Sequence, residues 1–238
     1  RWVWLGEAIG VDELIYYMFS DRHRQKPDPD RRYDRIYIGG DYGQQNATTF
    51  EAFGLDTYRK KFPGLGEYYH SGRESGRQKS PSEYARDLVE FMDELHEQYE
   101  NRIFYIFLDP SAKGLAEEVR RATRTGLDYQ VFLRDAENDV ALGISRVQKA
   151  LVFDIMSISP KQEYAVQEFG TYEYDKKSIE KGKEVPVKEA DHCMDAIRYV
   201  VMGAWSKIKH WLPLDIVEDD VNIGDIGSRE VREEDEYL

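Results

Sequence analysis

The 238-residue sequence contains one cysteine, Cys193, which excludes an intrachain disulfide and a zinc site built from cysteines. It has no run of about 18 apolar residues, which excludes an ordinary transmembrane helix. It also lacks an excess of positive charge, because 46 acidic residues stand against 33 Lys and Arg and give a net charge of −13. The single cysteine is compatible with a reducing compartment. The acidic balance argues against a protein that binds nucleic acid through a broad basic face.

The first residues lack the features of a secretory signal peptide. Acidic residues interrupt the apolar stretch RWVWLGEAIGVDELIYYMF, and no small-residue cleavage site follows it. The chain starts with Arg1, which is compatible with a piece of a longer protein. With 41% hydrophobic and 33% charged residues, the composition predicts one large globular domain with an appendage at either end.

The negative charge is concentrated at the C-terminus. Residues 215–238 hold ten acidic and two basic residues, a net charge of −8, which leaves −5 of the −13 for the remainder. A charged stretch with two prolines, DRHRQKPDPDRRYD, indicates a loop or linker near the other end. We therefore predict an N-terminal appendage or linker over residues 1–34, a folded domain over 35–210, and a solvated or partner-binding acidic tail over 211–238.

The hydrophobic pattern predicts three strands followed by alternating helices and strands. Residues 35–40, 48–55 and 66–71 are typical of strands joined by turns, and they predict an antiparallel meander. A helix is expected from Ser80 or Ser82, and RIFYIFL then indicates a strand buried on both faces in a parallel arrangement. Further strands are expected at YQVFL and LVFDIMSIS, with helices between them and a last helix over residues 189–207. This order predicts an α/β mixed sheet with helices on both faces and resembles the ribonuclease H-like fold.

Three acidic residues stand where such a fold can bring them together. Asp41 follows a predicted strand in IYIGGDYGQQNATTF, Asp109 follows another in IFYIFLDPSAKG, and Asp195 lies on the last helix in KEADHCMDAIRYVV. Adjacent parallel strands make Asp41 and Asp109 neighbours. Carboxylates that share a site repel one another, and Mg²⁺ or Mn²⁺ is the usual remedy because these cations prefer oxygen ligands. The pattern favours a metal-dependent phosphoryl-transfer site.

Each motif also has a structural explanation. Asp41 can form a turn at a strand end, and Asp109 before Pro110 and Ser111 is typical of a helix cap. A buried Asp195 needs a partner, either a metal or Arg198 one turn later. Asp191 suits a helix N-terminus. From the sequence alone, both the metal-site interpretation and these structural explanations remain open.

The three motifs taken in order, GGDYGQQNATTF, FLDPSAKG and EADHCMDAIRY, resemble the nuclease domain of the large terminase subunit of tailed bacteriophages. The resemblance covers about residues 35–205. It implies a divalent-metal-dependent endonuclease that cuts double-stranded DNA with little sequence preference during genome packaging, with two Mg²⁺ or Mn²⁺ ions. The implied catalytic residues are Asp41, Asp109, Asp195 and His192, and the implied metal ligands are Asp41, Asp109, Asp195 and Asp191.

The same resemblance implies partners and a location. The partners would be double-stranded DNA, a packaging ATPase domain, the portal and the small terminase subunit, and the location would be the cytoplasm of an infected bacterium, with no membrane contact. The candidate phosphate-binding lysines are Lys113, Lys176, Lys177, Lys181, Lys183 and Lys188. Acidic residues interleave with the last five, so an ordinary solvated loop is the competing interpretation.

Two other functions remain open from the sequence. The segment IGGDYGQQNATTF also resembles the first phosphate loop of actin- and chaperone-like ATPases, which share the core fold. That function needs a second glycine-rich loop where this chain has FLDPSAKG. A junction-resolving nuclease or a transposase of the same fold is a related possibility. A non-catalytic packaging-assembly module, with the carboxylates as plain caps, is the third interpretation.

Overall fold

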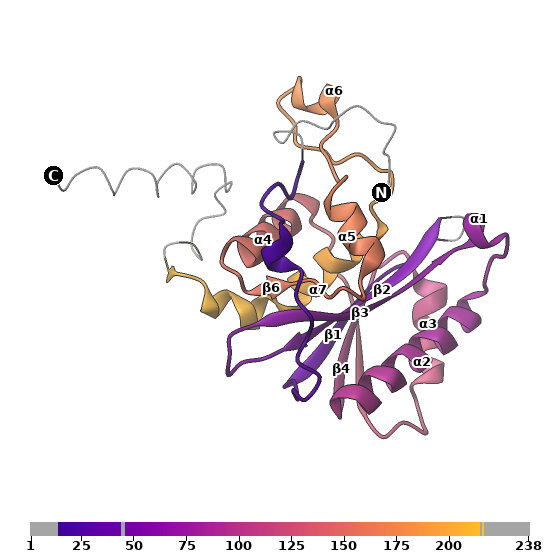
Figure 1. The fold of residues 1–238 in the computed structure, drawn as a ribbon. Coiled ribbons are helices and arrows are strands. Elements are labelled where there is room, and N and C mark those ends of the chain that lie inside the picture. The colour runs from indigo at the N-terminus through magenta and orange to yellow at the C-terminus, as the bar shows by residue number, and fades with distance from the viewer. Residues whose placement is uncertain (1–13, 44–45, 215, 217–238) are drawn as a thin grey trace, which may run out of the picture.

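The computed structural model describes residues 14–43, 46–214 and 216. Its centre is a six-stranded mixed sheet with the strand order β5-β4-β1-β2-β3-β6 (Figure 1). The strands are β1 (Arg35–Asp41), β2 (Ala47–Leu55), β3 (Phe62–Ser71), β4 (Ile103–Leu108), β5 (Gln130–Asp135) and β6 (Met156–Ser157). The predicted mixed sheet is confirmed.

The first three strands form the antiparallel meander that the sequence predicts. β1 pairs antiparallel with β2, and β2 pairs antiparallel with β3. β4 lies parallel to β1 on the other side, with Gly40 opposite Leu108, and β5 lies parallel to β4. A parallel neighbour needs a long crossover, which α2 supplies between β3 and β4.

Helices α2 (Pro81–Tyr99) and α3 (Lys113–Ala122) cover one face of the sheet (Figure 1). Ser80 caps α2, because its side chain accepts a hydrogen bond from the Glu83 amide. The buried side chains of α2 recur at helical spacing and pack against strand residues of even number such as Ile36, Ile38 and Ile106. The alternation of a strand therefore sends the odd-numbered residues of β1 and β4 to the opposite face.

Helices α4 (Val140–Val152), α5 (Glu163–Phe169) and α7 (His192–Ile208) pack on that opposite face. Gly39 makes the close approach of α7 possible: a Cβ there would lie 2.0 Å from the carbonyl oxygen of Ala196. Gly40 leaves space for Leu108 and Phe50 on the other face. The two glycines before Asp41 thus serve helix and side-chain packing.

The strand predicted at LVFDIMSIS is only partly present. Residues 151 and 152 end α4, and strand β6 is limited to Met156–Ser157. Asp154 between them has φ of 50°, a left-handed conformation that breaks the extended run. The apolar pattern was ambiguous here, because short apolar runs suit a buried helix end as well as a strand.

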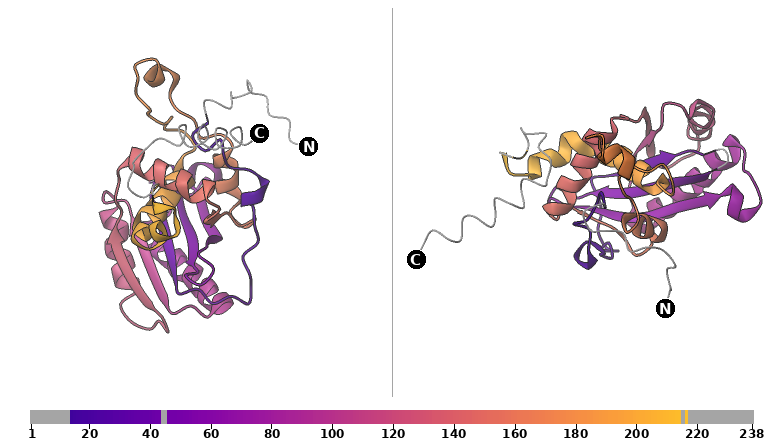
Figure 2. Two further views of the ribbon diagram at one scale, coloured as in Figure 1. Left: turned by 90° about the vertical axis from the view of Figure 1, so that its left-hand side faces the viewer. Right: turned by 90° about the horizontal axis from the view of Figure 1, so that it is seen from above.

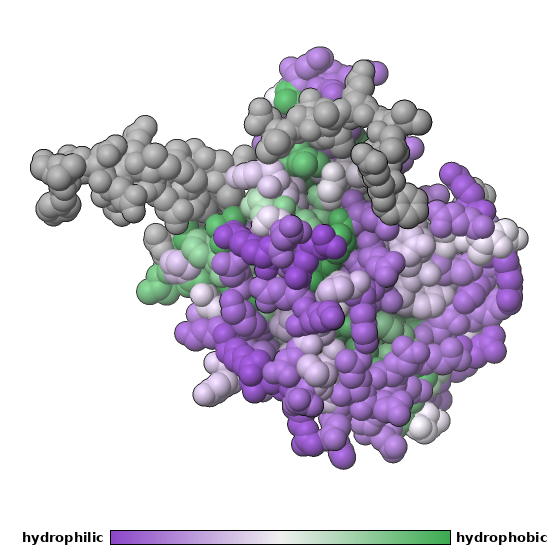
Figure 3. Space-filling model, in the orientation of Figure 1, coloured by the Kyte–Doolittle hydropathy of each residue, from purple (hydrophilic) through white to green (hydrophobic). Residues whose placement is uncertain are grey.

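Two segments pack around this core. Ile15 and Tyr16, before β1, are buried in the core on the α7 side, and Leu14 bridges to Glu173. Residues 174–186, with the short helix α6 (Lys176–Ile179), extend away from the sheet (Figure 2), and their surface is mainly hydrophilic (Figure 3).

Except for residues 211–214 and 216, the predicted acidic tail lies outside the described residues, and the predicted domain boundaries stay predictions. No described helix is long and apolar enough to cross a membrane.

Candidate active site

The parallel pair β1 and β4 brings Asp41 and Asp109 to one edge of the sheet. Asp41 is the last residue of β1, and Asp109 directly follows β4. Both have odd numbers, so both side chains are on the face that α7 covers. Two residues 68 positions apart in sequence therefore reach the same site, as the sequence predicted.

Helix α7, which packs on this face of the sheet, supplies the third predicted carboxylate, Asp195. Asp191 is its N-cap residue, His192 is its first residue, and Asp195 lies one turn further. Asp191 is 6% exposed and Asp195 is 9% exposed, so each carboxylate is nearly buried. A carboxylate in such a place needs a compensating charge or hydrogen bonds.

Asp41 is paired with His192. The Nδ1 atom of His192 donates a hydrogen bond to Oδ2 of Asp41 over 2.7 Å. Burial raises the pKa of Asp41, and the His192 contact offsets part of that effect. The contact with Asp41 in turn raises the pKa of His192 although burial opposes it. His192 therefore acts first as the counter-charge that holds Asp41 in place.

Asp109 is held by three donors. Its Oδ1 atom accepts from the Ser111 amide over 2.7 Å, and its Oδ2 atom accepts from Tyr199 Oη over 2.8 Å and from Asn138 Nδ2 over 3.2 Å. Burial acts to raise the pKa of Asp109, but the hydrogen bonds from Ser111 and Tyr199 outweigh it and lower the pKa. Asp109 is thus a carboxylate that stays ionised, and it forms a turn with Ser111 while Ala112 is the N-cap of α3.

Asp195 has two cationic partners. Its Oδ1 atom accepts from Arg198 Nη2 over 2.9 Å, and its Oδ2 atom accepts from Lys188 Nζ over 3.2 Å. The sequence anticipated the Arg198 pairing at i+3. Both terminal nitrogens of Arg198 also donate to Asn138 Oδ1 over 3.2 Å. Asn138 consequently links Arg198, which is the partner of Asp195 Oδ1, to Asp109.

Sequence reasoning missed Asn138 and Glu168. Asn138 follows β5, the neighbour of β4, and a polar residue after a strand at the same sheet edge was the available signal. Glu168 accepts hydrogen bonds from the amides of Cys193 and Met194 over 2.8 and 3.1 Å. It thereby caps α7, because the Asp191 side chain makes no capping hydrogen bond. Burial raises the pKa of Glu168 to about 8.

A second group of acidic residues lies deeper, below the start of α7. Glu51, Glu67 and Cys193 form the single group of three potential ligands, within 4.8 Å of one another, that the described residues contain. Glu51 and Glu67 are directly opposite each other on β2 and β3. Glu51 is fully buried and accepts hydrogen bonds from Thr49 and Gln162. Burial and the nearby Glu67 raise the pKa of Glu51, so this group is a hydrogen-bonded acid pair.

We predict that Glu51→Gln stabilises the fold at alkaline pH. A raised pKa in the folded state means that stability is full below the unfolded value of about 4.3 and falls as the pH rises toward the folded value. Glutamine keeps the shape without the charge, so the variant should match the wild type near pH 5 and exceed it by about 1–3 kcal/mol near pH 8. Urea unfolding at both pH values measures the difference. Glu74→Gln on the exposed helix α1 (Gly72–Ser75) is the control, and a larger gap at pH 5 than at pH 8 would contradict the prediction.

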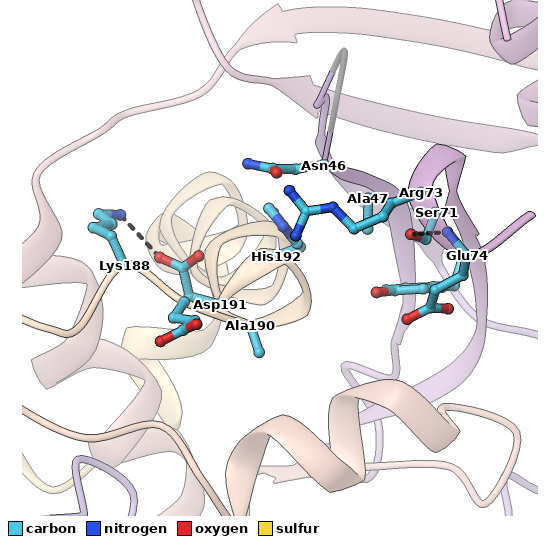
Figure 4. Close-up of a pocket in the computed structure, with 11 residues that line it drawn as sticks. Asn46, Ala47, Ser71, Arg73, Glu74, Lys188, Ala190, Asp191 and His192 are labelled. Atoms are coloured by element: carbon cyan, nitrogen blue, oxygen red, sulfur yellow. Dashed lines mark hydrogen bonds and ion pairs between the residues drawn. The ribbon is translucent and has the colours of Figure 1, made fainter. Parts of the chain in front are cut away.

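A pocket of about 390 Å³ opens beside Asp191 and His192. Figure 4 shows Lys188 and Asp191 on one side and Arg73, which points toward His192, on the other. Lys188 and Arg73 are the basic residues of the pocket lining, which also contains the acidic residues Glu74, Glu189 and Asp191. Lys113 is the first residue of α3, Lys176 and Lys177 are in α6, and Lys181 and Lys183 follow α6 in the protruding segment. Their predicted DNA contacts stay predictions.

The oxygen-rich set at this edge suits a hard divalent cation. Asp41, Asp109, Asp191 and Asp195 offer carboxylate oxygens, which Mg²⁺ and Mn²⁺ prefer. The Lys188 ammonium group, 3.1 Å from Asp191 Oδ2 and 3.2 Å from Asp195 Oδ2, marks a position that already attracts a cation. In this arrangement His192 compensates Asp41, and the Lys188 ammonium group is shared by Asp191 and Asp195.

Comparisons with known proteins agree with the resemblance. No protein-family model and no curated protein matches the chain. A large terminase structure from a thermophilic bacteriophage is 33% identical over 79% of this chain and 43% of that chain, with a TM-score of 0.68. The P22 large terminase nuclease domain is 16% identical over 81% and 92% of the two chains, with a TM-score of 0.60. The human cytomegalovirus terminase nuclease domain is 14% identical over 79% and 91% of the two chains, with a TM-score of 0.54.

The nuclease domains of P22 and cytomegalovirus establish the fold, because the matches cover 92% and 91% of their lengths with TM-scores of 0.60 and 0.54. The chain spans less than half the length of the phage terminase to which it is 33% identical. The resemblance stated from the three motifs is thus confirmed: over 79% of its length this chain is similar to a phage large terminase, and it has the ribonuclease H-like fold of terminase nuclease domains.

Proposed function

We propose that this chain is a divalent-metal-dependent endonuclease that cuts double-stranded DNA, with little sequence preference, during viral genome packaging. The observation that carries the proposal is the meeting of Asp41, Asp109 and Asp195 at one sheet edge, from two strands and a helix. The 33% identity to a phage large terminase supports the substrate and the biological setting. The opening beside Asp191 and His192 supports access for a phosphate group.

Asp41, Asp109 and Asp195, with Asp191 beside them, would hold two Mg²⁺ or Mn²⁺ ions, and Asp41 would be the shared ligand. A manganese-soaked form of the cytomegalovirus domain supports this cation class. When bound, such ions activate a water molecule and stabilise the leaving 3′-oxygen. His192 holds Asp41 in orientation through Nδ1, and this contact raises the pKa of His192, which favours the protonated ring as a proton donor. Tyr199 and Asn138 fix the orientation of Asp109.

DNA would enter along the open side of the pocket. Arg73 and Lys188 line it from opposite sides and supply positive charge for backbone phosphates (Figure 4). Lys113, Lys176, Lys177, Lys181 and Lys183 would extend the contact along the duplex. The packaging ATPase domain, the portal and the small terminase subunit are proposed as further partners on the same resemblance.

The test is the conversion of supercoiled plasmid into nicked and linear forms. The purified chain should cut with Mn²⁺ or Mg²⁺ and should not cut with EDTA. Asp109→Ala should remove cleavage, because it deletes an ionised ligand and leaves the Tyr199 and Asn138 donors in place. Lys61→Ala, on an exposed turn between β2 and β3, is the control and should cut normally. Intact plasmid under every metal condition would overturn the proposal.

A further inference from the structure

Lys188 occupies an unusual place in the site. Its ammonium nitrogen lies 3.1 Å from Asp191 Oδ2 and 3.2 Å from Asp195 Oδ2, so one cation bridges two carboxylates (Figure 4 shows the Asp191 contact). The two carboxylates are nearly buried, whereas 61% of the Lys188 side chain is exposed. The cation therefore reaches the acidic pair from the solvent side of the pocket.

The two cations on Asp195 differ in how firmly they are held. Arg198 is 1% exposed, comes from α7 itself, and is tied to Asn138 as well as to Asp195 Oδ1. Lys188 precedes α7 in the connecting loop, and its described ion pairs are those with Asp191 Oδ2 and Asp195 Oδ2. Arg198 is thus a permanent partner, and the Oδ2 side of Asp195 is the side that can exchange its cation.

The acidic pair also explains why an ammonium group binds here. Two carboxylates without a cation repel each other, and a compact ammonium point charge reduces that repulsion. A lysine ammonium group is charged throughout the neutral range. A divalent cation carries twice that charge and competes for the same oxygens.

We propose that Lys188 is an exchangeable counter-ion: it leaves Asp191 and Asp195 when a divalent cation binds, and the freed ammonium group then contacts a DNA phosphate in the same pocket. This inference rests on the proposed nuclease function. It gives Lys188 two consecutive tasks, keeping the empty acidic pair neutralised and then binding substrate. DNA binding by this residue is thereby made dependent on the metal.

The first test is Mn²⁺ binding to the DNA-free chain by calorimetry or by the electron paramagnetic resonance of free Mn²⁺. Lys188→Gln removes the competing cation and should tighten Mn²⁺ binding about three- to tenfold. Lys188→Arg keeps the charge and should bind Mn²⁺ as the wild type does. Lys207→Gln, at the exposed far end of α7, is the matched control. Thermal melting of each variant shows whether it is folded.

The second test is the salt dependence of DNA affinity in the presence of Ca²⁺ and in EDTA. Lys188→Gln should lower the slope of log K against log salt by about one with Ca²⁺ and leave it unchanged in EDTA. Unchanged or weaker Mn²⁺ binding by folded Lys188→Gln would overturn the exchange, and plasmid cleavage by the wild type would then leave the nuclease function standing. A wild type that neither binds Mn²⁺ nor cuts plasmid would overturn both.

Discussion

Asp41→Asn is expected to lower the rate of plasmid cleavage at least about a thousandfold, equivalent to roughly 4 kcal/mol of transition-state stabilisation. Asp41 ends β1 at the edge where Asp109 follows β4, and under the proposed function it would be the ligand that two cations share. Asparagine keeps the size and can still accept the hydrogen bond from His192. The loss would therefore report the missing charge.

The stability of Asp41→Asn should be equal to or higher than that of the wild type. Burial raises the pKa of Asp41, which means that the ionised carboxylate is unfavourable at this position without a cation. We expect the free energy of unfolding in EDTA to be within about 1 kcal/mol of the wild type or above it. A large loss of activity with no loss of stability separates a catalytic carboxylate from an ordinary strand-end turn.

Asp34→Asn is the matched control for this experiment. Asp34 directly precedes β1 and accepts hydrogen bonds from Thr57, so it is also a structural acid at an end of the same strand. Its replacement should leave cleavage unchanged. Normal cleavage by Asp41→Asn, or equal losses in both variants, would show that Asp41 has no special role.

The sequence predicted that Asp41 and Asp109 lie at the same sheet edge because strand alternation and strand pairing follow strong rules at these positions. Strand alternation and parallel pairing place Asp41 and Asp109 together once the order of strands and helices is known. The i+3 spacing predicts the Arg198 contact with Asp195, and the structure has it. These conclusions depend on local periodicity, which a single sequence displays.

The partners that come from distant segments were not predictable in the same way. Asn138 reaches Asp109 because β5 lies next to β4, and Glu168 caps α7 because α5 packs beside it. Neither position carries a local pattern that indicates its partner. The hydrogen-bonded pair Glu51 and Glu67 depends on the register between β2 and β3, which the turn of the hairpin and the β-bulge near Ala52 decide.

Arg198→Met is expected to destabilise the chain by about 3–5 kcal/mol, because it leaves the nearly buried Asp195 carboxylate without its permanent counter-charge. The arginine stem is closely enclosed: a Cβ on Gly143 would lie 2.3 Å from its Cγ atom. Methionine fills much of this volume, so the loss would come from the charge. Urea unfolding in EDTA measures it. Arg24→Met, which removes an exposed ion pair with Asp21, is the control and should cost less than about 1 kcal/mol.

The double variant Asp195→Leu, Arg198→Met separates the structural role of the pair from its chemical role. Removing both charges leaves no unpaired carboxylate, so much of the stability lost in Arg198→Met should return, while cleavage stays absent because Asp195 is gone. Saturating Mn²⁺ should also reduce the deficit of the single Arg198→Met variant, since a cation at Oδ2 compensates the same carboxylate, and should do nothing for the double variant. Equal effects of Mn²⁺ on both variants would mean that the ion binds away from Asp195, and would remove that residue from the metal site.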